Sequence, residues 1–177
     1  VFQPTQISVL SHLWFDGRHG MAVGEGNEVL IRRDGKWTTE YHPSFEALLS
    51  VMGDGAGGFV VVGDLGSIYK WDPVRLVWDS LYDTRLAVKL EAAQLVDASG
   101  QAWAAGGNRL WHFTGTSWVA ESLPATPVFS KVTALGLFDS RVIVGGEAQI
   151  SSGQPLPSSK GLLLVRTQQA LGDGGIG

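Results

Sequence analysis

Val61-Val62-Gly63-Asp64-Leu65-Gly66 is one of four copies of a short glycine-containing phrase in this chain. The other copies are Ala22-Val23-Gly24-Glu25-Gly26, Ala104-Ala105-Gly106-Gly107-Asn108 and Ile143-Val144-Gly145-Gly146-Glu147. Their first glycines lie 39, 43 and 39 residues apart in a sequence of 177 residues. A period of about 40 residues is the length of one four-stranded propeller blade. We therefore predict an all-β chain that forms a β-propeller with about four four-stranded blades.

The residues around each phrase have the patterns of strands and tight turns. Before each phrase, apolar and polar residues alternate, which is typical of a strand with two different faces. These first strands are predicted at residues 7–15, 47–52, 91–96 and 131–138, and third strands at 28–33, 67–71, 109–113 and 161–166. The turn pairs that follow the first strands are Asp16-Gly17, Asp54-Gly55, Ser99-Gly100 and Asp139-Ser140. Such residues favour the geometry of tight hairpins.

Alignment of the copies on their phrases gives each blade two apolar faces. It places Leu30, Ile68 and Leu110 on one face of the third strand, and Ile31, Tyr69 and Trp111 on the other. A fourth strand opens at Trp37, Trp78 and Trp118, whose rings are expected to fill the wedge between blades. A single blade exposes both faces, so neighbouring blades must stack to bury them.

The approximate blades are residues 5–42, 43–83, 88–124 and 128–172, in a single propeller domain or segment. The fourth copy departs from the pattern, because a Ser-, Pro- and Gly-rich insertion at 148–159 is expected to protrude as a loop. Its closing strand, 168–172, has no tryptophan. Val1 and the glycine-rich end indicate a piece of a longer chain. The blades would form a compact ring, a segment of a larger ring or half of a dimeric one, and Val1-Phe2-Gln3 could pair with the last blade.

Composition excludes several classes of function. Lysine and arginine number 13 against 17 acidic residues, and the net charge of −4 gives no general attraction to nucleic acid. No apolar run approaches the roughly 20 residues that span a bilayer, so membrane insertion is not expected. The absence of cysteine excludes disulfides, thiol catalysis and cysteine-ligated zinc, but it fits either redox compartment.

Two parts of the chain resemble known repeats. Phe15-Asp16-Gly17 through Trp37, and Gly58 through Trp78, are similar to blades of bacterial propellers of the photosystem-stability-factor and sialidase-like type. Val132 through Gly146, with Ala170-Leu171-Gly172, resembles cell-surface propeller repeats such as those of the fungal cortical marker. The resemblance implies binding of proteins, peptides or glycans by loops at one end of the ring. The location stays open, with a secreted, periplasmic or cell-surface one favoured.

Several side chains are candidates for binding. Alignment brings Arg32, Lys70 and His112 to one position, where their basic groups could hold an anion or a carboxylate. The alternative is that the apolar parts of these side chains pack between blades while their charged ends remain in solvent. Glu25, Asp64 and Glu147 recur on the phrase turns, either as binding groups or as solvated turn residues. Trp71 and Trp111 complete the candidates. We expect no cofactor and no metal, because the four histidines show no ligand spacing.

Three functions remain open at this stage. The first is a noncatalytic recognition or scaffold module that uses the turn edge and the loop at 149–159 to bind a protein or peptide. The second is a lectin-like module, which exposure of Trp14, Trp71 or Trp111 would favour. The third is a glycan-active hydrolase or lyase, which needs two convergent carboxyls with displaced pKa values. However, Asp34-Gly35-Lys36-Trp37 retains only the end of the sialidase signature, and no nucleophile motif is present. Partners would include further blades or a second copy of the chain.

Overall fold

Antiparallel strands make up nearly all of the regular structure. The computed structural model describes residues 9–81, 88–95, 102–123, 128–138, 141–149 and 161–167. The first sheet contains β1 (Leu10–Phe15), β2 (Gly20–Gly24), β3 (Glu28–Arg33) and β4 (Lys36–Tyr41). The second contains β5 (Leu48–Gly53), β6 (Phe59–Gly63), β7 (Ile68–Asp72) and β8 (Val77–Ser80), with a 3₁₀ turn η1 (Asp64–Gly66). The third contains β9 (Ala92–Leu95), β10 (Ala102–Gly106), β11 (Arg109–Phe113) and β12 (Trp118–Glu121). The fourth contains β13 (Val128–Phe138), β14 (Arg141–Gln149) and β15 (Gly161–Thr167).

The predicted strands are confirmed, with shifted ends in some cases. β3 and β11 begin and end at the predicted residues, whereas β13 begins at Val128 instead of Lys131. β14 continues through Glu147 to Gln149, so Glu147 lies in a strand and was wrongly expected on a turn. Five predicted features lie outside the described residues: the turns at 99–100 and 139–140, the insertion from 150 to 159, the closing strand at 168–172, and Val1-Phe2-Gln3.

Strands consecutive in the sequence are neighbours in every sheet, so each sheet is a meander. At the β3–β4 turn, Asp34 and Gly35 have φ values of 50° and 77°, the two successive positive values of a type I′ turn. Such a turn matches the twist of the strands, and Arg33 pairs directly with Lys36 across it. Asp16 closes the β1–β2 turn, because its Oδ1 accepts the amide protons of Arg18 at 2.8 Å and His19 at 2.6 Å.

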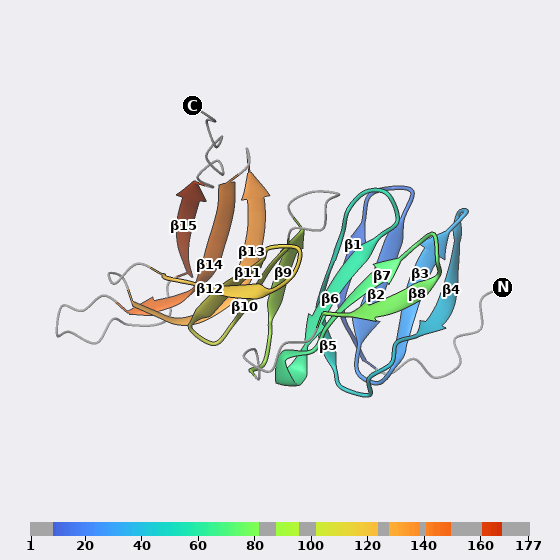
Figure 1. The fold of residues 1–177 in the computed structure, drawn as a ribbon, viewed down its shortest axis with the longest axis horizontal. Helices are drawn as coiled ribbons and strands as arrows, with labels where there is room; N and C mark the ends of the chain where they lie inside the picture. Colours follow the sequence, from blue (N-terminus) through green and yellow to red (C-terminus); the bar gives the residue numbers. More distant parts are fainter. Residues whose placement is uncertain are drawn as a thin grey trace, which may run out of the picture.

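The four sheets stand side by side with their first strands next to one another. β1 packs beside β5, β5 beside β9 and β9 beside β13, so the first strand of each sheet lies at the inner side of the series. Figure 1 shows the sheets following one another from the first, in blue, to the fourth, in orange and red. A sheet with two apolar faces is thereby covered by its neighbours, as the repeat predicts.

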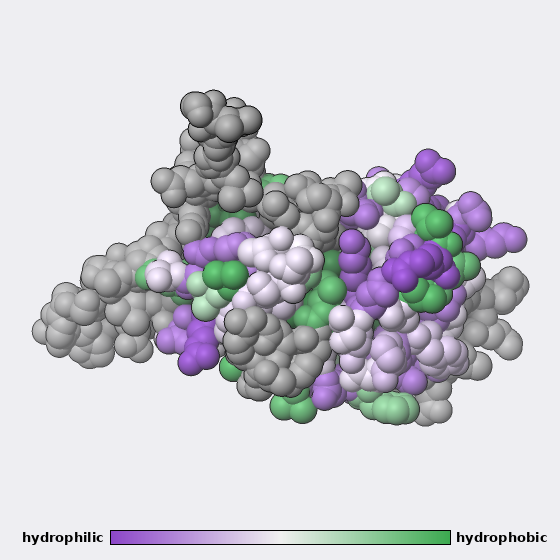
Figure 2. All heavy atoms as spheres, in the orientation of Figure 1, coloured by the Kyte–Doolittle hydropathy of each residue, from purple (hydrophilic) through white to green (hydrophobic). Residues whose placement is uncertain are grey.

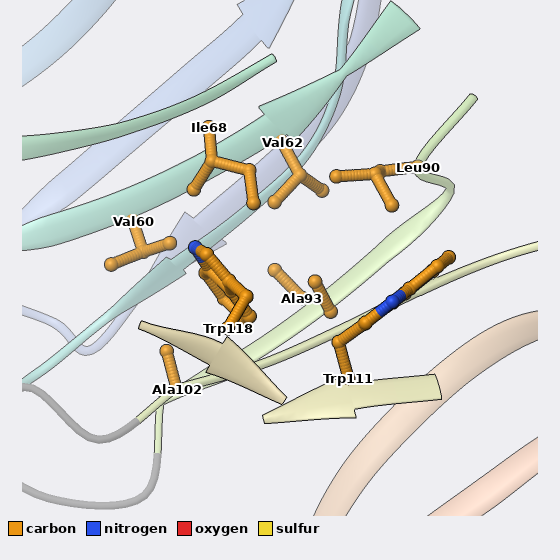
Figure 3. Packing of buried hydrophobic residues seen from close by; sticks show 9 residues of the cluster. Val60, Val62, Ile68, Leu90, Ala93, Ala102, Trp111 and Trp118 are labelled. Atoms are coloured by element: carbon orange, nitrogen blue, oxygen red, sulfur yellow. The ribbon is translucent and has the colours of Figure 1, made fainter. Parts of the chain in front are cut away.

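Three clusters of buried side chains fill the spaces between neighbouring sheets. The one between the second and third sheets contains Val60, Val62 and Ile68 on one side and Ala93, Ala104, Trp111 and Trp118 on the other. In Figure 3 the two tryptophan rings extend from the third sheet into this space. Trp118 also donates its indole N–H to the carbonyl of Leu81 at 3.0 Å, which links the two sheets by a hydrogen bond. The prediction that this tryptophan fills the wedge is confirmed.

One glycine in every sheet is fixed by a close approach of the backbone. A Cβ at Gly24, Gly63, Gly106 or Gly146 would overlap the carbonyl oxygen of Val9, Ala47, Lys89 or Lys131, respectively. The residue after that carbonyl begins the first strand in the first two sheets, lies just before β9 in the third and lies within β13 in the fourth. The two strands therefore approach without room for a side chain. The equivalent glycine of the fourth sheet is therefore Gly146, and the alignment on Gly145 was wrong by one residue. Two adjacent glycines concealed this register.

Strand pairing also corrects the alignment of the third strands. In the ladders Met21 pairs with Ile31, Val60 with Lys70 and Trp103 with His112. The glycine of the close approach follows three residues after Met21, Val60 and Trp103 in their respective sheets. Their partners Ile31, Lys70 and His112 are therefore equivalent. Arg32 lies one residue further along β3 and faces the opposite side of its sheet. The sequence did not distinguish these registers because Val29, Leu30 and Ile31 are all apolar.

We predict that Gly63→Ala destabilises the chain by about 3 kcal/mol, because the new methyl group must displace a strand crossing. Gly63 has an extended φ of −161°, so the cost comes from overlap with Ala47 and not from the backbone angle. Urea unfolding followed by circular dichroism measures the change. Gly136→Ala is the matched control, because a Cβ at Gly136 meets nothing within 4 Å and should change stability by less than about 1 kcal/mol. Equal effects of the two substitutions would contradict the crossing.

Candidate functional site

The turns of the first two sheets gather at two opposite ends. The β2–β3 and β6–β7 turns lie at one end, which we call the phrase end and which carries Glu25 and Asp64. The β1–β2, β3–β4 and β5–β6 turns lie at the other, which we call the aspartate end and which carries Asp16, Asp34 and Asp54. This separation follows from antiparallel pairing, since successive turns of a meander alternate between the ends.

A cleft of about 480 Å³ opens at the aspartate end, between the first and second sheets. Its lining includes Arg18, His19, Arg32, Arg33, Trp71 and Pro73. The first sheet thus contributes three arginines, a histidine and the acidic Asp34, and the second sheet contributes apolar groups. In Figure 2, polar residues cover most of the visible surface over these two sheets.

Local contacts fix two of the cleft arginines. Nη1 of Arg32 donates to the carbonyls of Gly17 at 3.2 Å and Arg18 at 2.6 Å, and its guanidinium lies 5.1 Å from the centre of the Phe15 ring. Nη2 of Arg33 donates to Oε1 of Glu40 at 2.7 Å, and its guanidinium lies 5.0 Å from the centre of a Trp71 ring. Both cations are held over aromatic rings, which orients them. Arg18 is exposed at the rim.

The β1–β2 turn also holds the histidine of the cleft. Nδ1 of His19 lies 3.3 Å from Oδ2 of Asp16. The pKa of Asp16 is lowered, mainly because the backbone amides of His19 and then Arg18 donate to its carboxylate. The carboxylate therefore supports the turn that presents Arg18 and His19. The sequence analysis missed Arg18, His19 and Arg33; the Asp16-Gly17-Arg18-His19 turn was their only signal.

The phrase end forms ion pairs between sheets. Lys89 Nζ lies 3.9 Å from Oδ1 of Asp64, and Lys131 Nζ lies 2.9 Å from Oε1 of Glu91. The pKa of Lys131 is raised, first by the hydrogen bond to Glu91, then by the charge of Glu91, with Glu147 adding to it. Glu25 is exposed, and its amide donates to the carbonyl of Val9. Asp64 and Glu147 thus lie near lysines of their own or a neighbouring sheet.

The predicted basic group is not assembled at one position. Lys70 pairs across the ladder with Asp79, and His112 Nδ1 lies 2.5 Å from Oε1 of Glu121. These two residues are equivalent in their sheets, whereas Arg32 lies on the opposite face and lines the cleft. Of the predicted basic residues, only Arg32 is brought together with other cations.

Two of the candidate binding tryptophans are buried, which corrects that expectation. Trp71 is 2% exposed and Trp111 is 3% exposed, each packed between two sheets. Trp14 is half-buried, with its ring edge-on to Phe59 at 5.7 Å between centroids. The aromatic faces that a lectin would stack on sugar are therefore not offered by Trp71 or Trp111. Both residues fill space where neighbouring sheets meet.

No group of three or more potential metal ligands occurs among the described residues. The pKa of Asp72 is lowered to about 2, first by the backbone amide of Arg75, then by its side chain and by the amide of Val74. Like Asp16, this carboxyl supports a turn. In the part of the chain that the structure describes, no helix has the length and apolar character to span a membrane.

Comparison with solved structures defines the class of fold. No protein-family profile and no curated protein matches the chain. YCF48 from Cyanidioschyzon merolae superimposes with a TM-score of 0.63 at 17% identity, over 79% of this chain and 49% of its own. YCF48 bound to D1 peptide superimposes with a TM-score of 0.64 at 20% identity, over 94% of this chain and 53% of its own. The WD40 propeller domain of Doa1 superimposes with a TM-score of 0.61 at 12% identity, over 77% of this chain and 47% of its own.

These likenesses confirm the predicted all-β propeller architecture. The chain spans about half the length of the solved propellers that it matches. Its sheets are propeller blades, and their series fits a partial propeller.

His42 joins the first sheet to the second from a buried position. Its Nε2 lies 3.0 Å from the carbonyl of Gly26, its Nδ1 accepts the amide proton of Ser44, and its ring packs near Tyr69 and Trp78. This pattern requires the neutral ring, with the proton on Nε2. Burial lowers the pKa of His42 below 6.5, although the Gly26 carbonyl and the charge of Glu46 oppose the shift.

We predict that His42 makes folding less favourable as the pH falls below about 6.5, the pKa of an unfolded histidine. The unfolded ring gains a proton there while the folded ring stays neutral, until the pH reaches the lowered folded-state pKa. Urea unfolding at pH 7.5 and pH 5.5 measures the loss. The His42→Gln variant keeps an N–H donor but should lack this part of the pH dependence. The same dependence in both proteins would contradict the role of His42.

Proposed function

We propose that the chain is a noncatalytic recognition module that binds an acidic segment of another protein in the cleft at the aspartate end. The cleft carries the proposal, because it combines arginines oriented by fixed contacts with an apolar wall at Trp71 and Pro73. Its volume of about 480 Å³ lies in the range of ligand pockets. Arginine is the side chain best suited to a carboxylate, since its planar fork donates two parallel hydrogen bonds.

One of the solved propellers, YCF48, adds support, because it was solved with a bound D1 peptide. A propeller of this class therefore provides a scaffold on which a peptide can bind, although identity of 20% carries no residue role to this chain. The net charge of −4 makes general attraction to acidic partners weak, so recognition would depend on this local group of cations.

The phrase end is the weaker candidate for the binding surface. Asp64 lies near Lys89 and Glu91 pairs with Lys131, so charges there stabilise contacts between sheets. The lectin hypothesis is weakened because two of its three candidate tryptophans, Trp71 and Trp111, are buried in the core. The glycosidase hypothesis gains no support from Asp16 and Asp72, whose carboxylates accept hydrogen bonds from turn amides.

We predict that a fluorescent Glu-rich peptide binds the chain more tightly than Lys-rich and Gly/Ser peptides of equal length, as measured by anisotropy. Binding should weaken with added salt, which screens exposed charges. Arg18→Ala should lower the affinity about tenfold, which corresponds to the loss of one charged hydrogen bond.

The matched control is Arg109→Ala. Arg109 is an exposed arginine at the start of β11, at the end of the third sheet that lies opposite the aspartate end. It should leave affinity unchanged. Equal loss in both variants, or equal binding of the Lys-rich peptide, would disprove recognition by the cleft.

A further inference from the structure

The β7–β8 turn adds exposed apolar side chains to the aspartate end. It joins Asp72 to Val77, and it lies at the same end as the β5–β6 turn because successive turns of a meander alternate between the two ends. Figure 1 shows both turns at the upper end of the second sheet. Within this turn, Val74 is 88% exposed and Leu76 is 53% exposed. We call these two side chains the apolar tip.

The apolar tip continues one wall of the cleft. Pro73, the residue before Val74, lines the cleft itself. Gly57 is adjacent both to this proline and to the histidine of the first sheet, since a Cβ on Gly57 would lie 3.5 Å from Cβ of Pro73 and 3.4 Å from Cδ2 of His19. A ligand that reaches the basic groups of the cleft therefore lies next to the turn that carries the apolar tip.

Leu76 has a backbone conformation that leucine rarely adopts. Its φ is 57°, in the left-handed region that favours glycine or asparagine, and its amide donates to the carbonyl of Asp72 at 2.9 Å. The half-exposed side chain recovers little of this cost by burial, and such strain is common at functional sites. Leu65 at the phrase end is also exposed with a positive φ, so it is the position beside the cleft that distinguishes Leu76.

The charged side chains around the apolar tip are paired with one another. Asp72 accepts the amide protons of Val74 at 2.8 Å and Arg75 at 2.9 Å, and Nε of Arg75 donates to Asp72 at 2.7 Å. Arg75 also forms an ion pair with Asp79, which pairs across the ladder with Lys70. Two acidic and two basic groups thus balance, so the turn would contribute apolar contacts rather than charge.

We propose that the segment bound in the cleft carries a large apolar side chain beside its acidic residues, and that this side chain packs on the apolar tip. The inference rests on the proposed function, because the arginines of the cleft define the acidic part of the ligand. Charge alone would let such a segment bind in several registers, whereas one apolar contact at a fixed place would select a single register. Ligand pockets combine apolar contacts with a few placed polar groups in this way.

Fluorescence anisotropy with a set of peptides tests the proposal. The parent peptide has a Glu-rich stretch with Ser residues on both sides, and in each other peptide one of these Ser residues is replaced by Leu. Leucine at one position should tighten binding about tenfold, since an aliphatic side chain is then partly buried. This gain should persist in salt that weakens the charged contacts. No gain at any position, or an equal gain at every position, would overturn the proposal.

Two leucines in the same backbone conformation provide a variant and its matched control. Leu76→Asn removes the larger side chain of the apolar tip, and asparagine suits the positive φ, so the circular dichroism spectrum should be kept. In this variant the affinity ratio of the Leu peptide to the parent peptide should fall from about ten to about one. Leu65→Asn changes a leucine with a φ of 55° and 64% exposure at the phrase end, and it should keep the higher ratio. Equal ratios in the two variants would contradict packing on the apolar tip.

The outcomes separate this inference from the proposed function. If the parent peptide binds and loses affinity in Arg18→Ala, but leucine adds nothing, the cleft recognises acidic segments and the inference about the apolar tip is wrong. If the parent peptide does not bind, the proposed function fails and this inference fails with it. If the Leu peptides bind equally well with Lys in place of Glu, the contact is apolar alone and both proposals are wrong.

Discussion

Each sheet of this protein has two apolar faces, and only another sheet of the same shape covers them. Within each sheet, a backbone carbonyl at or just before the first strand lies where a Cβ of the second-strand glycine would be, so these two strands approach closely. This close approach recurs in all four sheets. Neighbouring sheets are joined by the buried clusters, by the tryptophan hydrogen bond to Leu81 and by the ion pairs at the phrase end.

Much of the fold could be predicted from the sequence, because the repeat is expressed in residues with a physical reason to recur. The phrase glycines marked the strand crossings, and Asp-Gly pairs marked turns such as Asp34-Gly35. The register of the strands was harder to predict. A choice between Val29 and Leu30, or between Gly145 and Gly146, changes nothing in an apolar pattern, yet it decides which side of the sheet Arg32 faces. Only strand pairing settles such a choice.

The candidate site was predictable only in part. Arg32 could be singled out by alignment, but its neighbours Arg18, His19 and Arg33 come together through the geometry of two turns and a cleft between sheets. Trp71 and Trp111 show the opposite error. A tryptophan has the same sequence signature whether it binds a ligand or fills a core, and its burial depends on a sheet that lies far away in the sequence.

The central claim is that one sheet of this chain is not stable without its neighbours. Circular dichroism and proton NMR of the isolated second-sheet peptide, residues 43–83, test it most directly. The account predicts an unfolded peptide with no cooperative thermal transition, because Val51, Phe59, Val60 and Val62 would all lose their apolar cover. A dispersed spectrum with cooperative melting would contradict it.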